Sequence, residues 1–515
     1  MLKMYLNTTN TQVIIMIVKS ILPSVLLSLS LFLQNASAEV NYSPKTITEI
    51  QQQYKAGTKT AEQLTSEFIN RIKTQDANYN AVIAIDPTAI LQAKQLDKLL
   101  AQGQWAGPLH GITVLLKDNI HSKGAIATTA GSLALADNIG ETDATVVKKL
   151  RAAGAIILGK TNLSEWANFR SSYSSSGWSA IAGQTHNAVD ATRNPCGSSS
   201  GSAVAVALNF ATIALGTETD GSITCPASVN GVYAIKPSMG EVSRFGVIPL
   251  SSSQDTVGPM AHSLEDALTV LEVLQGKDPL DASTEKFIAK THNSMPKKTL
   301  RIGALNADKF TINTQQLYQR QLKKLTEAGH SVVPVEFEGD LNTLFVDEYF
   351  VLLYDFKVDL NNYLNNAPSS VKVRDLEQLI AFNEQHKEQE LRYFGQDILI
   401  QAQAIDVVAD QAKYLEAKQR YKKQALSLLE NAYSDIDVLI APTTSPAWKT
   451  DLINGDNFKG SSSSIPAIAG TTHISLAVGQ VSGLPVGLSI LAAPDQQQAA
   501  YVYAKQINDL LKKPE

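Results

Sequence analysis

Cysteine, histidine and surplus basic charge are all scarce in this chain of 515 residues. Two cysteines are too few for a disulfide scaffold or a cysteine-rich zinc site. The 8 histidines form no H-E-x-x-H motif and no i, i+4 pair, so we expect no metal and no other cofactor. Lys and Arg number 44 against 49 Asp and Glu, without a basic block, which argues against a nucleic-acid partner.

The apolar run near the N-terminus is too short for a membrane span. Residues 21–33 are apolar apart from a few serines and one proline, whereas a span needs roughly 20 residues. Lys19 precedes this run and Ala36-Ser37-Ala38 follows it, which is the pattern of a signal peptide and its cleavage site. We therefore predict a signal peptide over 1–38, with Met16 as an alternative start, and export to the periplasm or out of the cell. An uncleaved anchor is the alternative; after cleavage we expect no stable membrane association.

The remainder, 39–515, has the composition of one globular domain. Hydrophobic residues make up 44% and charged residues 18%, which excludes a disordered chain. Helical and strand-like segments alternate, and this order predicts an α/β fold with a largely parallel sheet. The stretch 341–431 is mostly helical and is expected to shape an entrance to the site. Helices are expected over 61–73, 87–100, 143–153, 314–328 and 496–511, and strands over 112–116, 155–158, 300–304, 331–335, 438–441, 474–478 and 486–491.

Two polar loops rich in glycine and serine, 197–202 and 216–222, lie close together in the sequence. A predicted helix over 203–208 and a predicted strand over 211–215 separate them. Such loops let backbone N–H groups converge on an anion or an oxyanion. A flexible linker is the plain alternative. A second alternative is a hydrolase elbow with Ser199 as nucleophile, but no strand precedes that turn.

The motifs in and around these loops resemble the amidase signature family, and within it the bacterial peptide amidase branch. They are GSSSGSAVAVA, GTETDGSI, LLKDNI, LGKTNLSEWANF, GVIPLSSSQDTVGPM and VLIAPTT. The similarity covers nearly the whole chain after the leader. It implies the amidase signature fold, with a large mixed, mostly parallel sheet, helices on both faces and a Ser-Ser-Lys site at the loop ends.

The resemblance implies a relay of two serines and a lysine. Ser222 is then the nucleophile that becomes acylated, and Ser198, behind a cis peptide bond, is the bridging residue. Lys117 is the base, and it can take a proton only while it is neutral. The apolar run 112–116 before Lys117 predicts the burial that would keep it neutral.

The resemblance also implies an oxyanion hole made of the backbone N–H groups of Thr219, Asp220, Gly221 and Ser222. Two positions depart from the wider family. Asp220 stands where much of the family has glycine, and Thr224 stands where many members have arginine. The missing arginine argues against a site that clamps the carboxylate of a free amino acid.

The expected activity is hydrolysis of carboxamide C–N bonds through an acyl-enzyme. The resemblance implies removal of the C-terminal amide from peptides, with release of ammonia. A broad amidase for small aliphatic, aromatic or fatty amides is the alternative. A glutaminase partner of a tRNA amidotransferase is disfavoured by the leader and by Thr224, and a non-catalytic binding protein by the complete relay.

Four further expectations concern single residues or short segments. Cys196 and Cys225 are expected to be buried free thiols, with a disulfide after export as the alternative. The loop 165–168 is expected to line the site, and a surface helix is nearly as plausible. His110 is interpreted as structural, because the relay has no use for it. The match of 369–372 to S-x-x-K is interpreted as chance.

Overall fold

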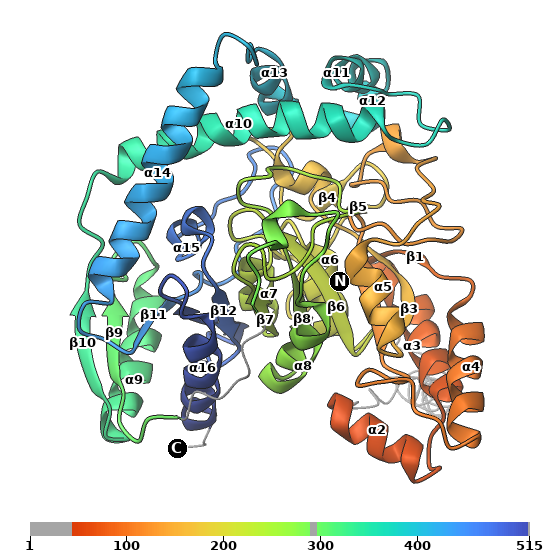
Figure 1. Cartoon of the computed structure of the whole chain (residues 1–515), viewed down its shortest axis with the longest axis horizontal. Coiled ribbons are helices and arrows are strands. Elements are labelled where there is room, and N and C mark those ends of the chain that lie inside the picture. The colour runs from red at the N-terminus through yellow and green to blue at the C-terminus, as the bar shows by residue number, and fades with distance from the viewer. Residues whose placement is uncertain (1–43, 289–295, 513–515) are drawn as a thin grey trace, which may run out of the picture. The chain divides into compact units, whose positions relative to one another are not determined.

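The computed structural model describes residues 44–288 and 296–512 (Figure 1). The predicted signal peptide over 1–38 therefore lies outside the described residues. Within the two described ranges, no helix is both long and apolar enough to cross a membrane.

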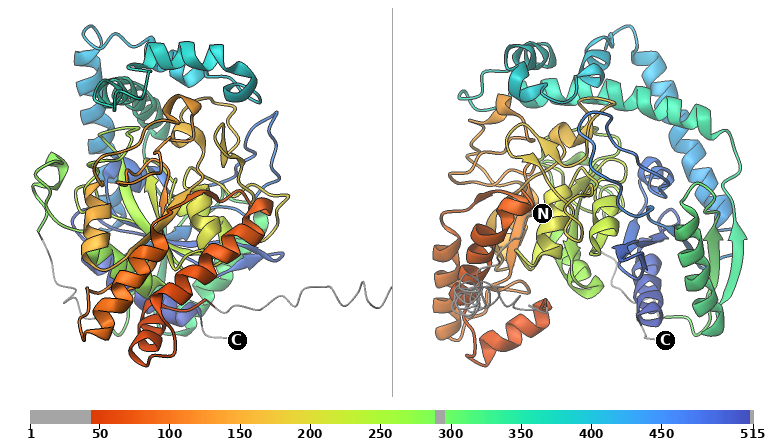
Figure 2. Two further views of the ribbon diagram at one scale, coloured as in Figure 1. Left: turned by 90° about the vertical axis from the view of Figure 1, so that its right-hand side faces the viewer. Right: turned by 180° about the vertical axis from the view of Figure 1, so that it is seen from behind.

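One large sheet of eleven strands organises the described chain (Figures 1 and 2). Helices pack on both of its faces, as expected for the amidase signature fold. Its strands, in spatial order, are β1 (Val82–Ile85), β3 (Ile156–Thr161), β2 (Thr113–Lys117), β6 (Ile213–Glu218), β8 (Thr256–Ala261), β7 (Tyr233–Lys236), β12 (His473–Leu476), β15 (Leu488–Leu491), β11 (Val438–Pro442), β9 (Arg301–Leu305) and β10 (Ser331–Val335).

The predicted large mixed sheet is confirmed, and its parallel part is smaller than the sequence pattern suggested. Parallel pairing occurs in two blocks, β3-β2-β6 and β11-β9-β10, where helices such as α5 (Thr145–Ala152) and α9 (Ile312–Glu327) connect consecutive strands. From β6 to β11, all neighbouring strands are antiparallel. For one of these pairs the cause is local: β12 is linked to β15 by a short hairpin, β13 (Gln480–Val481) with β14 (Leu484–Pro485), and a hairpin joins antiparallel strands.

Outside the stretch 341–431, ten helices of the described chain surround the sheet and its loops. The first long one begins at Ala61, as predicted, and is capped by Thr60, whose side chain accepts from the N–H of Gln63, while the Gln63 side chain accepts from the Thr60 N–H. The next begins at Ala89 rather than at 87, because the Asp86 carboxylate accepts the N–H of Thr88 in a turn before the helix. These helices are α2 (Ile47–Lys55), α3 (Ala61–Gln75), α4 (Ala89–Ala101), α5 (Thr145–Ala152), α6 (Ser200–Ala207), α7 (Thr224–Asn230), α8 (Leu264–Leu274), α9 (Ile312–Glu327), α15 (Ser464–Ala469) and α16 (Gln497–Leu511).

The stretch 341–431 is helical, as predicted. Its helices are α10 (Leu341–Asn365), α11 (Leu376–Gln385), α12 (Lys387–Glu390), α13 (Asp397–Gln403) and α14 (Gln411–Ala432). Figure 1 shows α10 running along one side of the sheet, with α14 beside it. Phe356 of α10 packs on Phe169, with ring centroids 5.3 Å apart, in an apolar cluster that also includes Trp166 and Ala130. This helical segment is therefore joined to the loops that leave β2 and β3.

The second glycine-serine loop is shorter than predicted. The strand expected over 211–215 is β6, which continues to Glu218, so residues 216–218 belong to the sheet. Gly216, Thr217 and Glu218 pair with Gly258, Val257 and Thr256 of β8. That pairing joins segments about forty residues apart, which local sequence patterns do not show. The loop proper is Thr219–Ile223, between β6 and α7.

Candidate active site

Lys117 is the last residue of β2, and its side chain is fully buried. Its Nζ donates to Ser198 Oγ at 2.7 Å, to Thr217 Oγ1 at 2.8 Å and to the Thr217 carbonyl at 3.2 Å. Burial lowers the pKa of Lys117 from its usual 10.5 to about 7, although Asp255 and Glu218 oppose the shift through their charge. The predicted burial is confirmed, and the lowered pKa of Lys117 favours the neutral amine that a base needs.

Ser198 and Ser199 follow each other but have different surroundings. The Gly197–Ser198 peptide bond is cis, as the family resemblance implied. Ser198 Oγ faces Lys117. Ser199 Oγ instead donates to the Thr217 carbonyl at 3.0 Å and accepts the Thr217 N–H at 3.2 Å, with no exposed surface. Both bonds tie Ser199 to the backbone of β6, so the elbow alternative with Ser199 as nucleophile is not supported.

Ser222 lies at the end of the loop that follows β6, and its carbonyl accepts the Ser199 N–H at 3.0 Å. This bond joins the two serine loops. Ser222 Oγ makes no hydrogen bond to any residue in the ranges that the structure describes. The hydrogen bond between Ser222 and Ser198 that the relay needs is therefore not formed in this structure. Ser222 is 7% exposed. The Ser222 hydroxyl thus has no protein partner within the described ranges, and the bond from the Ser199 N–H brings its loop next to the one that carries Ser198.

Four backbone donors lie next to Ser222. In the described chain, the N–H groups of Thr219, Asp220, Gly221 and Ser222 donate to no protein acceptor. Gly221 adopts φ +76°, and a Cβ at this position would lie 2.9 Å from Ser463 Oγ. The loop therefore presents a run of unpaired amides, which is suited to a negatively charged oxygen.

Two serines from α15 and its N-terminus hold Asp220. Ser463 Oγ donates to one carboxylate oxygen at 2.5 Å, and Ser464 Oγ donates to the other at 2.7 Å. Burial raises the pKa of Asp220. The carboxyl of Glu348 on α10 lies close enough for their charges to interact, and burial together with Asp220 raises the pKa of Glu348 to about 8.

Thr224, which stands where many family members have arginine, stabilises the start of α7. One oxygen of the Glu218 carboxylate accepts the N–H of Ile223 at 2.8 Å, the N–H of Thr224 at 2.9 Å and the Thr224 hydroxyl at 3.1 Å. Carboxylates at helix N-termini pair well with free amides. Thr224 therefore has a structural partner and is turned toward Glu218.

The expectation of two free thiols was wrong. Cys196 and Cys225 form a disulfide with their Cα atoms 6.0 Å apart. Cys196 precedes the Ser198 loop and Cys225 lies on α7 just after Ser222, so the bond joins the two serine loops. The sequence did not reveal the pairing, because the positions of two cysteines in a chain of 515 residues do not show how far apart they lie in the fold.

The segment 165–168 is neither a surface helix nor an open loop. It forms a short 3-10 turn in which Trp166, Ala167 and Asn168 have positive φ values. Ser164, just before it, donates its N–H to the Ser198 carbonyl at 3.1 Å, so the segment begins next to the serine loop. Its role in lining the site stays a prediction.

The contacts of His110 are to residues just before it in the chain. Its ring stacks on Trp105 at 4.1 Å between centroids, and Nδ1 accepts the Ala106 N–H at 3.0 Å. These contacts agree with the structural interpretation of His110.

Several residues that organise the site were missed. Thr217 lies inside the GTETDGSI motif, and Asn119, whose Nδ2 donates to Thr217 Oγ1 at 3.0 Å, lies two residues after Lys117. Nearness to the motifs was a usable signal for these two. Gln254 lies inside the GVIPLSSSQDTVGPM motif, so the same signal was usable for it. Ser463 carries no such signal, because it reaches the site from a distant part of the chain.

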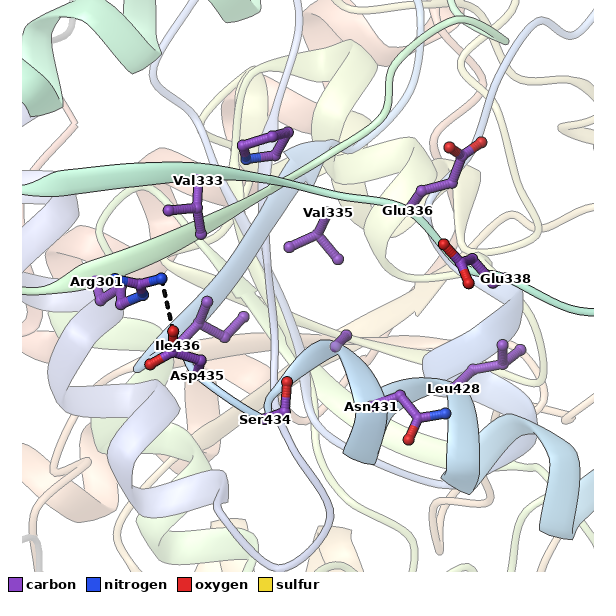
Figure 3. A pocket seen from close by; sticks show the side chains of 12 residues that line it. Arg301, Val333, Val335, Glu336, Glu338, Leu428, Asn431, Ser434, Asp435 and Ile436 are labelled. Atoms are coloured by element: carbon purple, nitrogen blue, oxygen red, sulfur yellow. Dashed lines mark ion pairs between the residues drawn. The ribbon is translucent and has the colours of Figure 1, made fainter.

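A pocket of about 470 Å³ lies elsewhere, beside the edge strand β10 and the end of α14 (Figure 3). Glu336 and Glu338 lie on one side of it, and the ion pair of Arg301 with Asp435 at 2.6 Å lies on the other. None of the predicted site residues lines it, so this pocket is separate from the candidate site.

Comparison with known proteins agrees with this geometry over most of the chain. The amidase family model matches residues 63–499. A probable amidase of Arabidopsis thaliana is 34% identical over 492 residues, covering 93% of this chain and 92% of its own. One glutamyl-tRNA(Gln) amidotransferase subunit, from Prochlorococcus marinus, is 31% identical over 482 residues, covering 90% of this chain and 96% of its own.

Among solved structures, the native peptide amidase from Stenotrophomonas maltophilia is similar at 40% identity, with a TM-score of 0.83. The match covers 91% of this chain and 98% of that chain. Family match, full-length relatives and fold agree with one another and with the resemblance found in the motifs. The chain therefore belongs to the amidase signature family and is an enzyme that hydrolyses amides.

Proposed function

We propose that this enzyme removes the C-terminal amide from peptides, using Ser222 as nucleophile, Ser198 as bridge and Lys117 as base. The observation that carries the mechanism is the 2.7 Å hydrogen bond between the buried Lys117 Nζ and Ser198 Oγ. The likeness to a solved peptide amidase over 91% of the chain supports the substrate class.

In the proposed acylation, neutral Lys117 takes the proton of Ser198 Oγ while Ser198 takes that of Ser222 Oγ. The freed Ser222 oxygen attacks the amide carbon, and the carbonyl oxygen becomes an oxyanion that faces the unpaired N–H groups of the 219–222 loop. As the C–N bond breaks, the proton passes back through Ser198 to the leaving nitrogen and ammonia departs. Water then attacks the ester on Ser222 and releases the peptide acid.

Specificity for an uncharged terminus follows from what surrounds the loop. Glu348 and Asp220 bring carboxyl groups to this side of the site, and Thr224 replaces an arginine. A free carboxylate would find no positively charged partner among these residues, so its binding would be penalised. A neutral amide carries no charge, so its binding would not be penalised in this way. We infer that the helical segment 341–431 shapes the entrance through α10, which supplies Glu348.

We infer export as well, from the leader predicted over 1–38. The Cys196–Cys225 disulfide supports it, because disulfides persist in oxidising compartments. Fractionation of cells that express the full chain, with N-terminal sequencing of the product, tests this inference. A mature N-terminus at Glu39 in the exported fraction is expected.

The test of function is ammonia release from a C-terminally amidated dipeptide and, separately, from benzamide, with Ser222→Ala as the blank. Preference for the peptide amide, lost in the blank, is the expected result. Preference for benzamide would replace the substrate class with small amides and leave the relay intact. Activity that survives in Ser222→Ala would mean that the nucleophile is another residue.

A further inference from the structure

The unpaired N–H groups of the 219–222 loop belong to rigid peptide units. In a trans peptide, the C=O of one residue and the N–H of the next lie in one plane and point in opposite directions. A hydrogen bond that holds the carbonyl therefore also fixes the direction of the following N–H.

Three of the carbonyls behind these donors are held by hydrogen bonds. The Glu218 carbonyl accepts Thr256 Oγ1 at 3.1 Å, and the Gly221 carbonyl accepts the N–H of Cys225 at 2.8 Å. The Thr219 carbonyl, which shares its peptide plane with the Asp220 N–H, accepts Gln254 Nε2 at 3.2 Å. The first two are local to the strand pair and to α7, whereas the third comes from a separate loop.

Gln254 is 2% exposed, and its amide nitrogen has both hydrogens in use. One goes to the Thr219 carbonyl and the other to Glu348 Oε1 of α10, at 3.0 Å. The next residue, Asp255, accepts the Thr219 hydroxyl at 2.6 Å. Thr219 is thus held through its backbone and its side chain by two consecutive residues.

We propose that Gln254 is a positioning residue for the reaction: by holding the Thr219 carbonyl, it directs the Asp220 N–H toward the developing oxyanion, and Glu348 holds Gln254 in turn. This inference rests on the proposed function, since it assigns the 219–222 amides to the oxyanion. A purely structural glutamine would contribute to folding alone, whereas a positioning glutamine acts on the transition state more than on bound substrate.

The test compares Gln254→Met with Gln396→Met. Gln396 is a matched control: it is similarly buried, and its Nε2 also donates to one backbone carbonyl, of Ile380 at 3.2 Å, and one glutamate, Glu384 at 3.1 Å. Methionine keeps the length of the side chain and removes the N–H donor.

We expect kcat of Gln254→Met to fall about 10- to 100-fold, less than the roughly 10²- to 10³-fold loss when a donor itself is removed. KM should stay within about two-fold, and inhibition by a peptide aldehyde, whose adduct with Ser222 carries the oxyanion, should weaken by the same factor as kcat. Gln396→Met should lose a similar amount of thermal stability and keep its kcat.

Unchanged kcat in folded Gln254→Met would overturn the inference, as would equal kcat losses in the two variants. If Gln254→Met does not fold, Glu348→Leu replaces it; that variant leaves Gln254 in place without its second acceptor and should lower kcat with KM held. Wild-type protein inactive on every amide offered would instead refute the proposed function, so the two failures are distinguishable.

Discussion

Lys117 and Ser198 share a 2.7 Å hydrogen bond in a place where neither side chain has any exposed surface. A buried ammonium is costly unless a carboxylate pairs with it. The partners of Lys117 Nζ within the described chain are two hydroxyls and one carbonyl, all neutral. This arrangement favours the neutral amine, which is the form that can accept a proton.

Lys117→Met should therefore lower kcat/KM at least about 10³-fold while the protein stays folded, since removing one member of a relay removes most of its effect. Ammonia release together with circular dichroism checks this. The control is Lys372→Met, at an exposed lysine in the chance S-x-x-K match, which should leave activity unchanged. Comparable activity in Lys117→Met and wild type would rule out Lys117 as the base.

The pH profile should rise through pH about 7, because Lys117 must lose its proton to act and its pKa lies near that value. It should fall above pH about 8, where Glu348 ionises beside Asp220 and adds negative charge near the oxyanion. Tyr421 of α14 also faces Glu348 and stays protonated there, because burial and the Asp355 and Glu348 charges raise its pKa. The measurement is kcat/KM from pH 5 to pH 10.

The Glu348→Gln variant tests whether ionisation of Glu348 causes the fall of kcat/KM at alkaline pH. With no group to ionise at position 348, the fall should move to higher pH while the acid limb stays where Lys117 places it. An alkaline limb unaffected by this change would mean that another group causes it.

Loss of the disulfide should destabilise the protein by about 3–4 kcal/mol, the loop-closure value for a separation of 29 residues. The double variant Cys196→Ser, Cys225→Ser and the reduced wild type should show the same loss in urea unfolding. Agreement between the two separates the effect of the bond from that of the new serines. Unfolding midpoints equal to that of the oxidised wild type would contradict the prediction.

Arg170 should be one of the most sensitive buried positions. It pairs with Glu165 at 3.0 Å and with Glu390 at 3.6 Å, and its guanidinium lies over the ring of Phe394 at 4.2 Å. Arg170→Ala leaves buried carboxylates unpaired, so unfolding should cost about 3–5 kcal/mol less. Arg301→Ala, which breaks an exposed pair with Asp435, should cost no more than about 1 kcal/mol. Similar losses in both variants would contradict this reasoning.

Most of the fold and the core of the site could be predicted where the information is local. The helix predicted over 61–73 begins at Ala61, where Thr60 caps it, and Lys117 is buried because an apolar strand leads into it. The Ser-Gly motifs identified the two loops that carry Ser198 and Ser222. These features depend on neighbouring residues, whose pattern is visible in the chain.

What could not be predicted depends on contacts between distant segments. The extension of β6 to Glu218 requires β8, and the antiparallel centre of the sheet requires the order of strands in space. Gln254, Glu348 and Ser463 reach the catalytic loops from three separate segments. Gln254 lies in a motif that the sequence shows, but no spacing or composition pattern connects any of the three residues to the catalytic loops, because the contacts are made only after folding.

The disulfide has a consequence for chain integrity. Residues 196–225 form a covalently closed ring that contains both serines, α6 and β6. A protease cut inside that ring opens it without dividing the protein, so Ser198 and Ser222 would still belong to one molecule. A nicked enzyme would migrate as a single species without reductant and as two fragments with it.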